Sequence, residues 1–199
     1  MGNLYPELDQ RLRKFIASQS VFFVATAPCL TPDGYGGHVN LSPKGYQDTF
    51  AILGPTTVAY IDLTGSGAET IAHLRQNGQI TIMFCSFEHQ PKILRLYGAG
   101  RVLLPGEPGW DEFAGHFPCS AGSGTGRASR RAIIVVDLHR IADSCGYAVP
   151  VMELVAERDV LTRWADGKSA EELAAYRAAK NAVSIDGLPA LDYAPTGFS

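Results

Sequence analysis

The residues most able to do chemistry lie in a short stretch, residues 37–45, with the sequence GHVNLSPKG. Its alternating polar and apolar residues are typical of a strand, which leads into Ser42, a proline and the isolated Lys44. A lysine acts as a point charge toward phosphate, and a neighbouring hydroxyl adds a directed donor. The stretch predicts an anion site at a sheet edge, but it also fits a solvated lysine in a Pro-Lys-Gly turn.

A second candidate anion site follows in residues 62–75, where a buried-looking strand, a Gly-rich turn and an amphipathic helix succeed one another. A helix N-terminus offers free N–H groups and a favourable dipole to an anion. Because the carboxylate of Glu69 would repel a phosphate, we expect the phosphate nearer Thr64 and Thr70 than Glu69, or Glu69 turned away from it. Ser66 and Glu69 also have the spacing of a capping box, which needs no ligand, so the role of Ser66 stays open.

Two arginines, Arg95 and Arg101, lie on a predicted strand at residues 92–104. If Leu94 and Leu96 face inward, both arginines face the other way, as surface arginines commonly do. A reduced flavin, however, needs positive charge near its N1 and O2 atoms. One of the two arginines is therefore a candidate flavin contact, and the alternative is an ordinary surface residue.

The two anion motifs and the strand ILRLYGAGRV at residues 93–102 resemble the pyridoxamine 5'-phosphate oxidase-like family of FMN-binding split-barrel proteins. The resemblance covers about residues 15–140 and is closer to uncharacterised relatives that carry the sequence SPKG than to the vitamin enzyme itself. In the vitamin enzyme an Arg-Lys pair opens the helix after the Gly-Ser turn, whereas this chain has Glu69 and Thr70 there. The resemblance thus implies flavin binding, while this departure argues against pyridoxamine phosphate as the substrate.

The fold implied by the resemblance is mainly β with peripheral helices, an FMN-binding split β-barrel. The cofactor would lie in a groove between the subunits of a homodimer. The cofactor-binding candidates are Asn40, Ser42, Lys44, Thr64, Ser66, Thr70 and Arg95. Tyr147 lies in a Ser-Cys-Gly-Tyr segment similar to that of close relatives and is a candidate residue on the substrate side. The same segment also fits a simple connection between a strand and a helix.

The implied function is that of an FMN-binding protein, a flavin-dependent oxidoreductase acting on an unidentified small molecule. No residue stands out as a general acid or base, so catalytic residues stay unknown, which fits chemistry carried by the flavin. Two classes of alternative remain. One is a flavin, haem or bilin carrier without turnover, and the other is a reductase that uses the deazaflavin F420.

Composition and charge narrow the function classes further. The 199 residues carry a net charge of −3, which argues against a nucleic-acid partner. No segment reaches the roughly 18 uninterrupted apolar residues of a membrane span, and the N-terminus lacks a signal-peptide pattern, so we expect a cytoplasmic protein. The four cysteines and five histidines show no metal-binding or dithiol spacing. We therefore predict free thiols and no metal site.

Many short strands around one helix predict a small antiparallel barrel over residues 1–142, with a helical extension over 143–199 packed on the same domain. The expected strands are residues 20–27, 37–41, 49–53, 56–63, 79–86, 92–104 and 132–136. The expected helices are residues 8–18, 68–76 and 105–117, a helix that ends at Gly167, and a helix capped by Ser169 and Glu172. The helix that ends at Gly167 is indicated by an apolar stripe of Val160, Leu161, Trp164 and Ala165. We expect a mobile loop at 119–131, irregular backbone at 144–150, and an ordered turn or a tail at 184–199.

Overall fold

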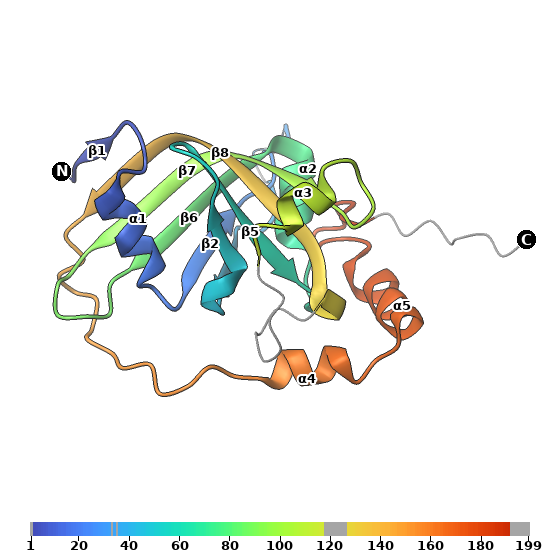
Figure 1. The fold of residues 1–199 in the computed structure, drawn as a ribbon. Coiled ribbons are helices and arrows are strands. Elements are labelled where there is room, and N and C mark those ends of the chain that lie inside the picture. The colour runs from blue at the N-terminus through green and yellow to red at the C-terminus, as the bar shows by residue number, and fades with distance from the viewer. Residues whose placement is uncertain (1, 33, 35, 118–126, 192–199) are drawn as a thin grey trace, which may run out of the picture.

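The computed structural model describes residues 2–32, 34, 36–117 and 127–191 (Figure 1). Within these residues, eight strands form one antiparallel sheet in the order β3-β2-β6-β7-β8-β5-β4, and β1 pairs with β8. The strands are β1 (Leu4–Tyr5), β2 (Phe22–Thr26), β3 (Asn40–Lys44), β4 (Phe50–Ile52), β5 (Thr57–Leu63), β6 (Gln79–Cys85), β7 (Ile93–Leu103) and β8 (Arg130–Ser144). The α-helices are α1 (Gln10–Ala17), α2 (Glu69–Asn77), α3 (Trp110–Ala114), α4 (Val160–Asp166) and α5 (Ala170–Asn181), and the 3-10 helices are η1 (Gln47–Thr49) and η2 (Arg127–Ser129).

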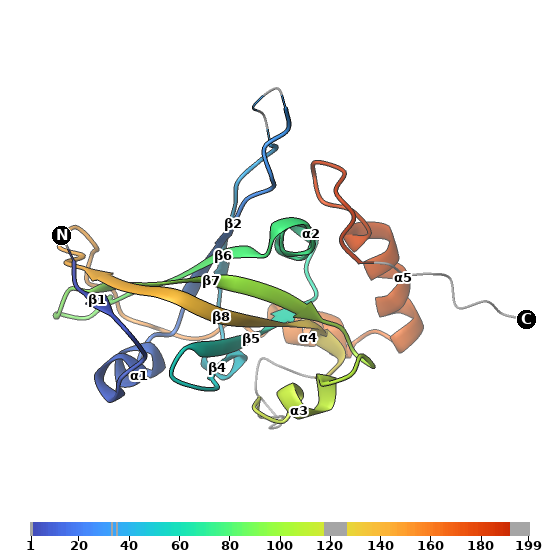
Figure 2. The same cartoon turned by 90° about the horizontal axis from the view of Figure 1, so that it is seen from above.

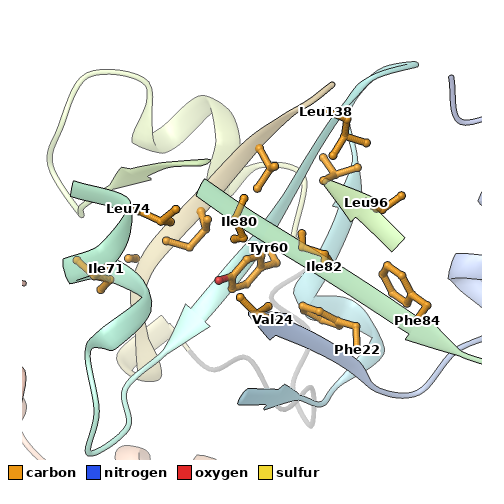
Figure 3. Packing of buried hydrophobic residues seen from close by; sticks show 14 of the residues in the cluster. Phe22, Val24, Tyr60, Ile71, Leu74, Ile80, Ile82, Phe84, Leu96 and Leu138 are labelled. Carbon is orange, nitrogen blue, oxygen red and sulfur yellow. The ribbon is translucent and has the colours of Figure 1, made fainter. Parts of the chain in front are cut away.

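The concave face of the curled sheet holds the main core (Figure 3). Four aromatic side chains from different strands meet there: the ring centroids of Phe22 and Tyr60 are 5.5 Å apart, and those of Phe50 and Phe84 are 5.1 Å apart. Such edge-to-face pairs contribute about 0.5–1.5 kcal/mol each beyond their buried area. They join β2, β4, β5 and β6 into a half-closed barrel, the split β-barrel expected from the sequence.

Helix α2 packs against this core through Ile71 and Leu74 (Figure 3). The helix approaches β7 closely because Gly100 has no side chain, and a Cβ there would lie 2.9 Å from a methyl carbon of Leu74. The helix ends at Gly78, whose φ of 70° is a left-handed conformation that glycine adopts without strain. This packing fixes the N-terminal end of α2 beside the strand β3.

The central part of β8 is buried on both faces, which explains its unbroken apolar run. Ile134 and Val136 belong to the main core, whereas Ile133 and Val135 pack in a second cluster with Phe117 under α3. A strand covered on both sides needs no alternation of polar and apolar residues. The predicted strand at residues 132–136 is this doubly buried part of a longer strand, which also pairs with both β5 and β7.

Several sequence predictions need correction. The helix predicted at residues 105–117 shortens to α3, because its first half carries two prolines and the left-handed Gly106 and Gly109. Strand β3 begins at Asn40 rather than residue 37, since Gly37 has a φ of 102°. The loop predicted at 119–131 lies mostly outside the described residues, but its end forms η2 and opens β8.

The last part of the chain follows an extended connection that runs along the molecule before α4 (Figure 1). The predicted capping box of α5 is confirmed: Glu172 N donates to Ser169 Oγ, and Ser169 N donates to Glu172 Oε2. Beyond α5, the bridge between Val183 and Pro189 forms an ordered turn, and residues 192–199 of the predicted turn or tail lie outside the described residues. None of the described helices has the length and apolar character to cross a membrane.

Candidate functional site

The centre of the site is a buried ionic cluster of Asp62, Lys44 and Arg131. Lys44 Nζ lies 3.1 Å from Asp62 Oδ1, and Arg131 donates to Asp62 Oδ2 from Nε at 2.9 Å and from Nη2 at 2.5 Å. Asp62 stands at the end of β5, Lys44 at the end of β3 and Arg131 at the start of β8. The cluster thus ties together three strands at one end of the half-barrel.

The charge balance of this cluster is positive. Burial by itself would raise the pKa of Asp62, but attraction to Arg131 and Lys44 outweighs it and lowers the pKa below the usual value. Asp62 is therefore a carboxylate, and two cations with one carboxylate leave one net positive charge. That charge is available to a ligand only where a cation reaches open space.

Lys44 is the cation that reaches such space. Its side chain is 22% exposed, whereas that of Arg131 is 4% exposed and that of Asp62 is fully buried. Lys44 lines a cavity of about 210 Å³, together with the turn after β5 and Leu161 of α4. The predicted lysine is therefore neither a free surface residue nor fully neutralised, and one end of the cavity is positively charged.

A network of polar side chains continues from β3 under the N-terminal end of α2. Asn40 Nδ2 donates to the hydroxyl oxygens of Thr26 and Thr70 at 3.1 and 3.0 Å. Thr26 Oγ1 also lies 2.9 Å from Nδ1 of the buried His73. The predicted residues Asn40 and Thr70 are thus brought together, but their hydrogen bonds serve this network. Burial lowers the pKa of His73, although Asp186 and Glu69 oppose the shift.

Ser42 lies between Asn40 and Lys44 on the same side of β3. Its Oγ is buried and has no hydrogen-bond partner within the described structure. Burying an unpaired hydroxyl costs about 1–3 kcal/mol, so an additional polar group beside it would be stabilising. Ser42 itself does not line the cavity, whereas its neighbours Pro43 and Lys44 do.

The Gly-rich turn after β5 is held by the C-terminal helix α5. Thr64 Oγ1 donates to the carbonyl of Ser129 at 3.0 Å and accepts from Nε of Arg177 at 3.0 Å. Asn181 Nδ2 donates to the carbonyl of Gly65 at 2.9 Å. The single hydroxyl proton of Thr64 is thus used within the protein, and the turn has a fixed shape before any ligand binds.

The capping box predicted at the start of α2 does not form. The N-cap residue is Ala68, which cannot cap through its side chain, and Ser66 is exposed at the tip of the turn. Glu69 instead accepts a hydrogen bond at 3.3 Å from the backbone N–H of Ile185 in the C-terminal turn. The capping-box interpretation was wrong because Glu69 accepts from the distant Ile185 and not, as a capping box requires, from the backbone N–H of Ser66.

Arg95 and Tyr147 lie apart from this cluster. The buried Leu94 and Leu96 lie on the concave face, so Arg95 points to the opposite face, where its Nη1 donates to Ser144 Oγ at 3.0 Å. Arg101 stacks on the ring of Phe113, 5.2 Å from its centroid. Tyr147 is 81% exposed in the segment after β8. Neither Arg95 nor Tyr147 lines the cavity beside Lys44.

A larger cavity, of about 300 Å³, lies elsewhere, between the connection from α1 to β2 (residues 18–21), residues 87–88 and residues 152–154. Its lining includes Glu88 and Glu153 but no lysine or arginine. Two carboxylates would repel a phosphate, so the smaller cavity beside Lys44 is the better candidate despite its size. In the part of the chain that the structure describes, no three His, Cys, Asp or Glu side chains are grouped to hold a metal ion. Cys29, Cys85 and Cys145 are free thiols, and Cys119 lies outside this part.

Three functional residues were missed from the sequence: Asp62, Arg131 and Arg177. An aspartate within an apolar strand was the available signal, because a buried carboxylate needs cationic partners. Arg131 lies on β8, 69 positions after Asp62, and Arg177 lies on α5, 113 positions after its partner Thr64. No local pattern indicates either pairing.

Comparison with known proteins places the chain in a family. The family model described as pyridoxamine 5'-phosphate oxidase matches residues 8–145, and the chain belongs to this family. A curated relative, the pyridoxamine 5'-phosphate oxidase family protein ustO of Aspergillus flavus, is 38% identical over 205 residues, covering 96% of this chain and 78% of the relative.

Several solved structures are similar to this chain at low sequence identity. HupZ of Group A Streptococcus matches with a TM-score of 0.50 and 19% identity, over 73% of this chain and 98% of its own. An FMN-binding protein from Syntrophomonas wolfei has a TM-score of 0.46 and 15% identity, over 66% and 82% of the two chains. HutZ, a haem storage protein from Vibrio cholerae, has a TM-score of 0.46 and 12% identity, over 71% and 98%. The likeness to HupZ, at a TM-score of 0.50, shows a shared fold.

Proposed function

We propose that this protein binds FMN, with the terminal phosphate of the cofactor in the cavity beside Lys44. The observation that carries the proposal is the net positive charge of the Lys44, Asp62 and Arg131 cluster at the wall of that cavity. A charge-assisted hydrogen bond from a lysine to phosphate is about twice as strong as a neutral one. Because the chain belongs to the pyridoxamine 5'-phosphate oxidase family, we take the ligand that carries this phosphate to be a flavin.

The other residues of the site have supporting roles in this proposal. Ser42 would give its unpartnered hydroxyl to the phosphate or to a water beside it. Asp62 accepts hydrogen bonds from both Lys44 and Arg131, and Arg131 balances the charge of this buried carboxylate. Asn40 and Thr70 fix the end of β3 against α2. When bound, the flavin would supply hydride or electron transfer to a small-molecule substrate.

The working unit in this proposal is a homodimer. A cavity of about 210 Å³ is below the roughly 300–1,000 Å³ of typical small-molecule pockets, so it would hold only one end of FMN. The convex face of the sheet carries apolar side chains that are only partly covered: Phe23, Ala25, Leu41, Met83 and Tyr97. We call this set the convex apolar patch. A second subunit covering it would complete the groove, since exposed apolar patches commonly mark association surfaces.

This arrangement also gives Arg95 a role. It faces the same side of the sheet as the convex apolar patch, because it pairs in register with Met83. In a homodimer Arg95 would lie close to the subunit boundary, where a positive charge near the flavin ring stabilises its reduced form. Within the same proposal the protein works in the cytoplasm and has neither nucleic acid nor membrane as a partner.

The absorption spectrum of the purified protein tests the proposal. Bound FMN gives the two visible bands of an oxidised flavin, which bleach on reduction by NADH or NADPH if the protein is an oxidoreductase. Bands of haem, bilin or deazaflavin would contradict the proposal and identify a different ligand. If the protein is purified without a chromophore, the apoprotein is titrated with FMN and with haem, and tight binding of haem alone would contradict it.

A further inference from the structure

The two cations of the site are not equally able to meet a ligand. Arg131 uses Nε and Nη2 on Asp62 and donates from Nη1 to the carbonyl of Gly67 at 2.7 Å. Lys44 has three N–H donors, of which one contacts Asp62, and it lines the cavity. An anion in the cavity therefore shares Lys44 with Asp62, while Arg131 stays bound to the protein.

Asp62 carries a full negative charge 3.1 Å from the ammonium of Lys44, the group that an anionic ligand in the cavity would contact. The carboxylate is fully buried, and charges in such surroundings are screened much less than in water. Repulsion between Asp62 and an incoming anion grows with the charge of that anion. A dianionic phosphate is thus opposed more strongly than a monoanion at the same position.

We propose that Asp62 is a built-in counter-ion that competes with the anionic group of the ligand for Lys44. In this role Asp62 lowers the affinity for the phosphate and keeps the cofactor exchangeable. It also balances the buried guanidinium of Arg131, so the same carboxylate stabilises the folded apoprotein and weakens ligand binding. This inference rests on the proposed function in one respect, that the anion at Lys44 is the phosphate of FMN.

The opposite role for Asp62 is that it orients Lys44 for the ligand and so increases affinity. Asp62→Asn separates the two, because asparagine has the shape of aspartate and its one amide oxygen accepts from Lys44 when the NH2 group takes the place of Oδ2. The NH2 group then faces Arg131, whose two donors lose their acceptor. The substitution keeps the orientation and removes the charge. A competing counter-ion predicts tighter binding in the variant, and an orienting role predicts unchanged or weaker binding.

The experiment is titration of wild-type and Asp62→Asn apoprotein with FMN, riboflavin and inorganic phosphate. We expect FMN and phosphate to bind at least tenfold more tightly to the variant and riboflavin, which lacks the phosphate, to bind equally. Thermal stability of the apoprotein should fall, because Arg131 loses its counter-ion. The matched control is Asp137→Asn, which removes an exposed carboxylate bonded to Thr57 and should change neither affinity nor stability.

FMN affinity that is unchanged or reduced in a folded Asp62→Asn protein would overturn the inference while leaving FMN binding intact. Tighter phosphate binding by the variant, with no FMN binding by either protein, would support the inference and contradict the proposed cofactor. Binding of neither probe would overturn both. If Asp62→Asn does not fold, Asp62→Ser replaces it, because serine leaves room for water beside Arg131. The affinities of Asp62→Ser and wild-type protein for FMN, riboflavin and phosphate are then compared, and tighter binding of FMN and phosphate supports the inference.

Discussion

Arg177 of α5 donates a hydrogen bond from Nε to the hydroxyl of Thr64, 113 positions earlier in the chain, at 3.0 Å. Its Nη2 also donates to the carbonyl of Ala128 at 2.7 Å. One side chain from the C-terminal helix thereby joins the Gly-rich turn after β5 to the segment that opens β8. The turn beside the candidate phosphate site depends on a helix that lies beyond the barrel in sequence.

Arg177→Ala should therefore loosen the turn. We expect the free energy of unfolding to fall by about 1.5–3 kcal/mol, the range for hydrogen bonds that involve a charged group, and FMN to bind more weakly. Chemical denaturation and FMN titration measure the two effects. Arg163→Ala is the control, because Arg163 and its partner Asp159 are both exposed and such a pair contributes at most about 1 kcal/mol. Equal effects of the two substitutions would refute the role given to Arg177.

The buried pair of Arg131 and Asp62 should show strong coupling. Arg131→Met alone leaves Asp62 with only Lys44, and removal of one partner of a buried ion pair costs about 3–5 kcal/mol. The double variant Arg131→Met with Asp62→Asn should lose less stability than the sum of the single variants, because no buried charge is left unpaired. Additive losses in denaturant unfolding would show that the two side chains are not energetically coupled.

The buried His73 predicts a dependence of stability on pH. Its pKa is lowered by burial, so on acidification the unfolded chain takes up a proton before the folded one does. Stability should be constant above about pH 6.5, the ordinary histidine value, and fall as the pH decreases from there toward the lowered pKa. His73→Gln should flatten the unfolding free energy over this interval. His116→Gln, at an exposed position, should leave the pH profile of the wild type unchanged, and an identical profile for His73→Gln would mean that His73 does not cause the slope.

The homodimer is tested through the convex apolar patch. Leu41 is 66% exposed in this patch, so Leu41→Lys should cost a monomer little stability but place a charge in the proposed interface. Analytical ultracentrifugation should show dissociation of the variant at protein concentrations where the wild type is dimeric, with loss of FMN. A wild-type monomer that retains full FMN affinity would show that the site is complete within one chain.

The positions of β2 to β8 along the chain could be predicted from the sequence, because β-branched and aromatic runs are separated by glycine and proline. Their order in the sheet was not predicted. The start of β3 was placed too early, since an extended-looking sequence hides the left-handed backbone of Gly37. At the site, Lys44 was found because a lone cation after a proline is a local signal. Its partners Asp62 and Arg131 were not, because the pairing is made by sheet topology. The described residues between β2 and β3 project from the sheet (Figure 2), whereas their Gly-rich sequence indicates only a break between two strands.

The central claim, that the Lys44 cavity holds the phosphate of FMN, is tested most directly by titrating wild-type and Lys44→Ala apoprotein with FMN and riboflavin. Stability alone cannot decide it, because Lys44 also supports the buried Asp62 and the variant should be less stable. FMN affinity should fall by about 1.5–3 kcal/mol, the range for a charged hydrogen bond. Riboflavin affinity should stay unchanged. Equal weakening of FMN and riboflavin, or no weakening of either, would contradict the phosphate site at Lys44.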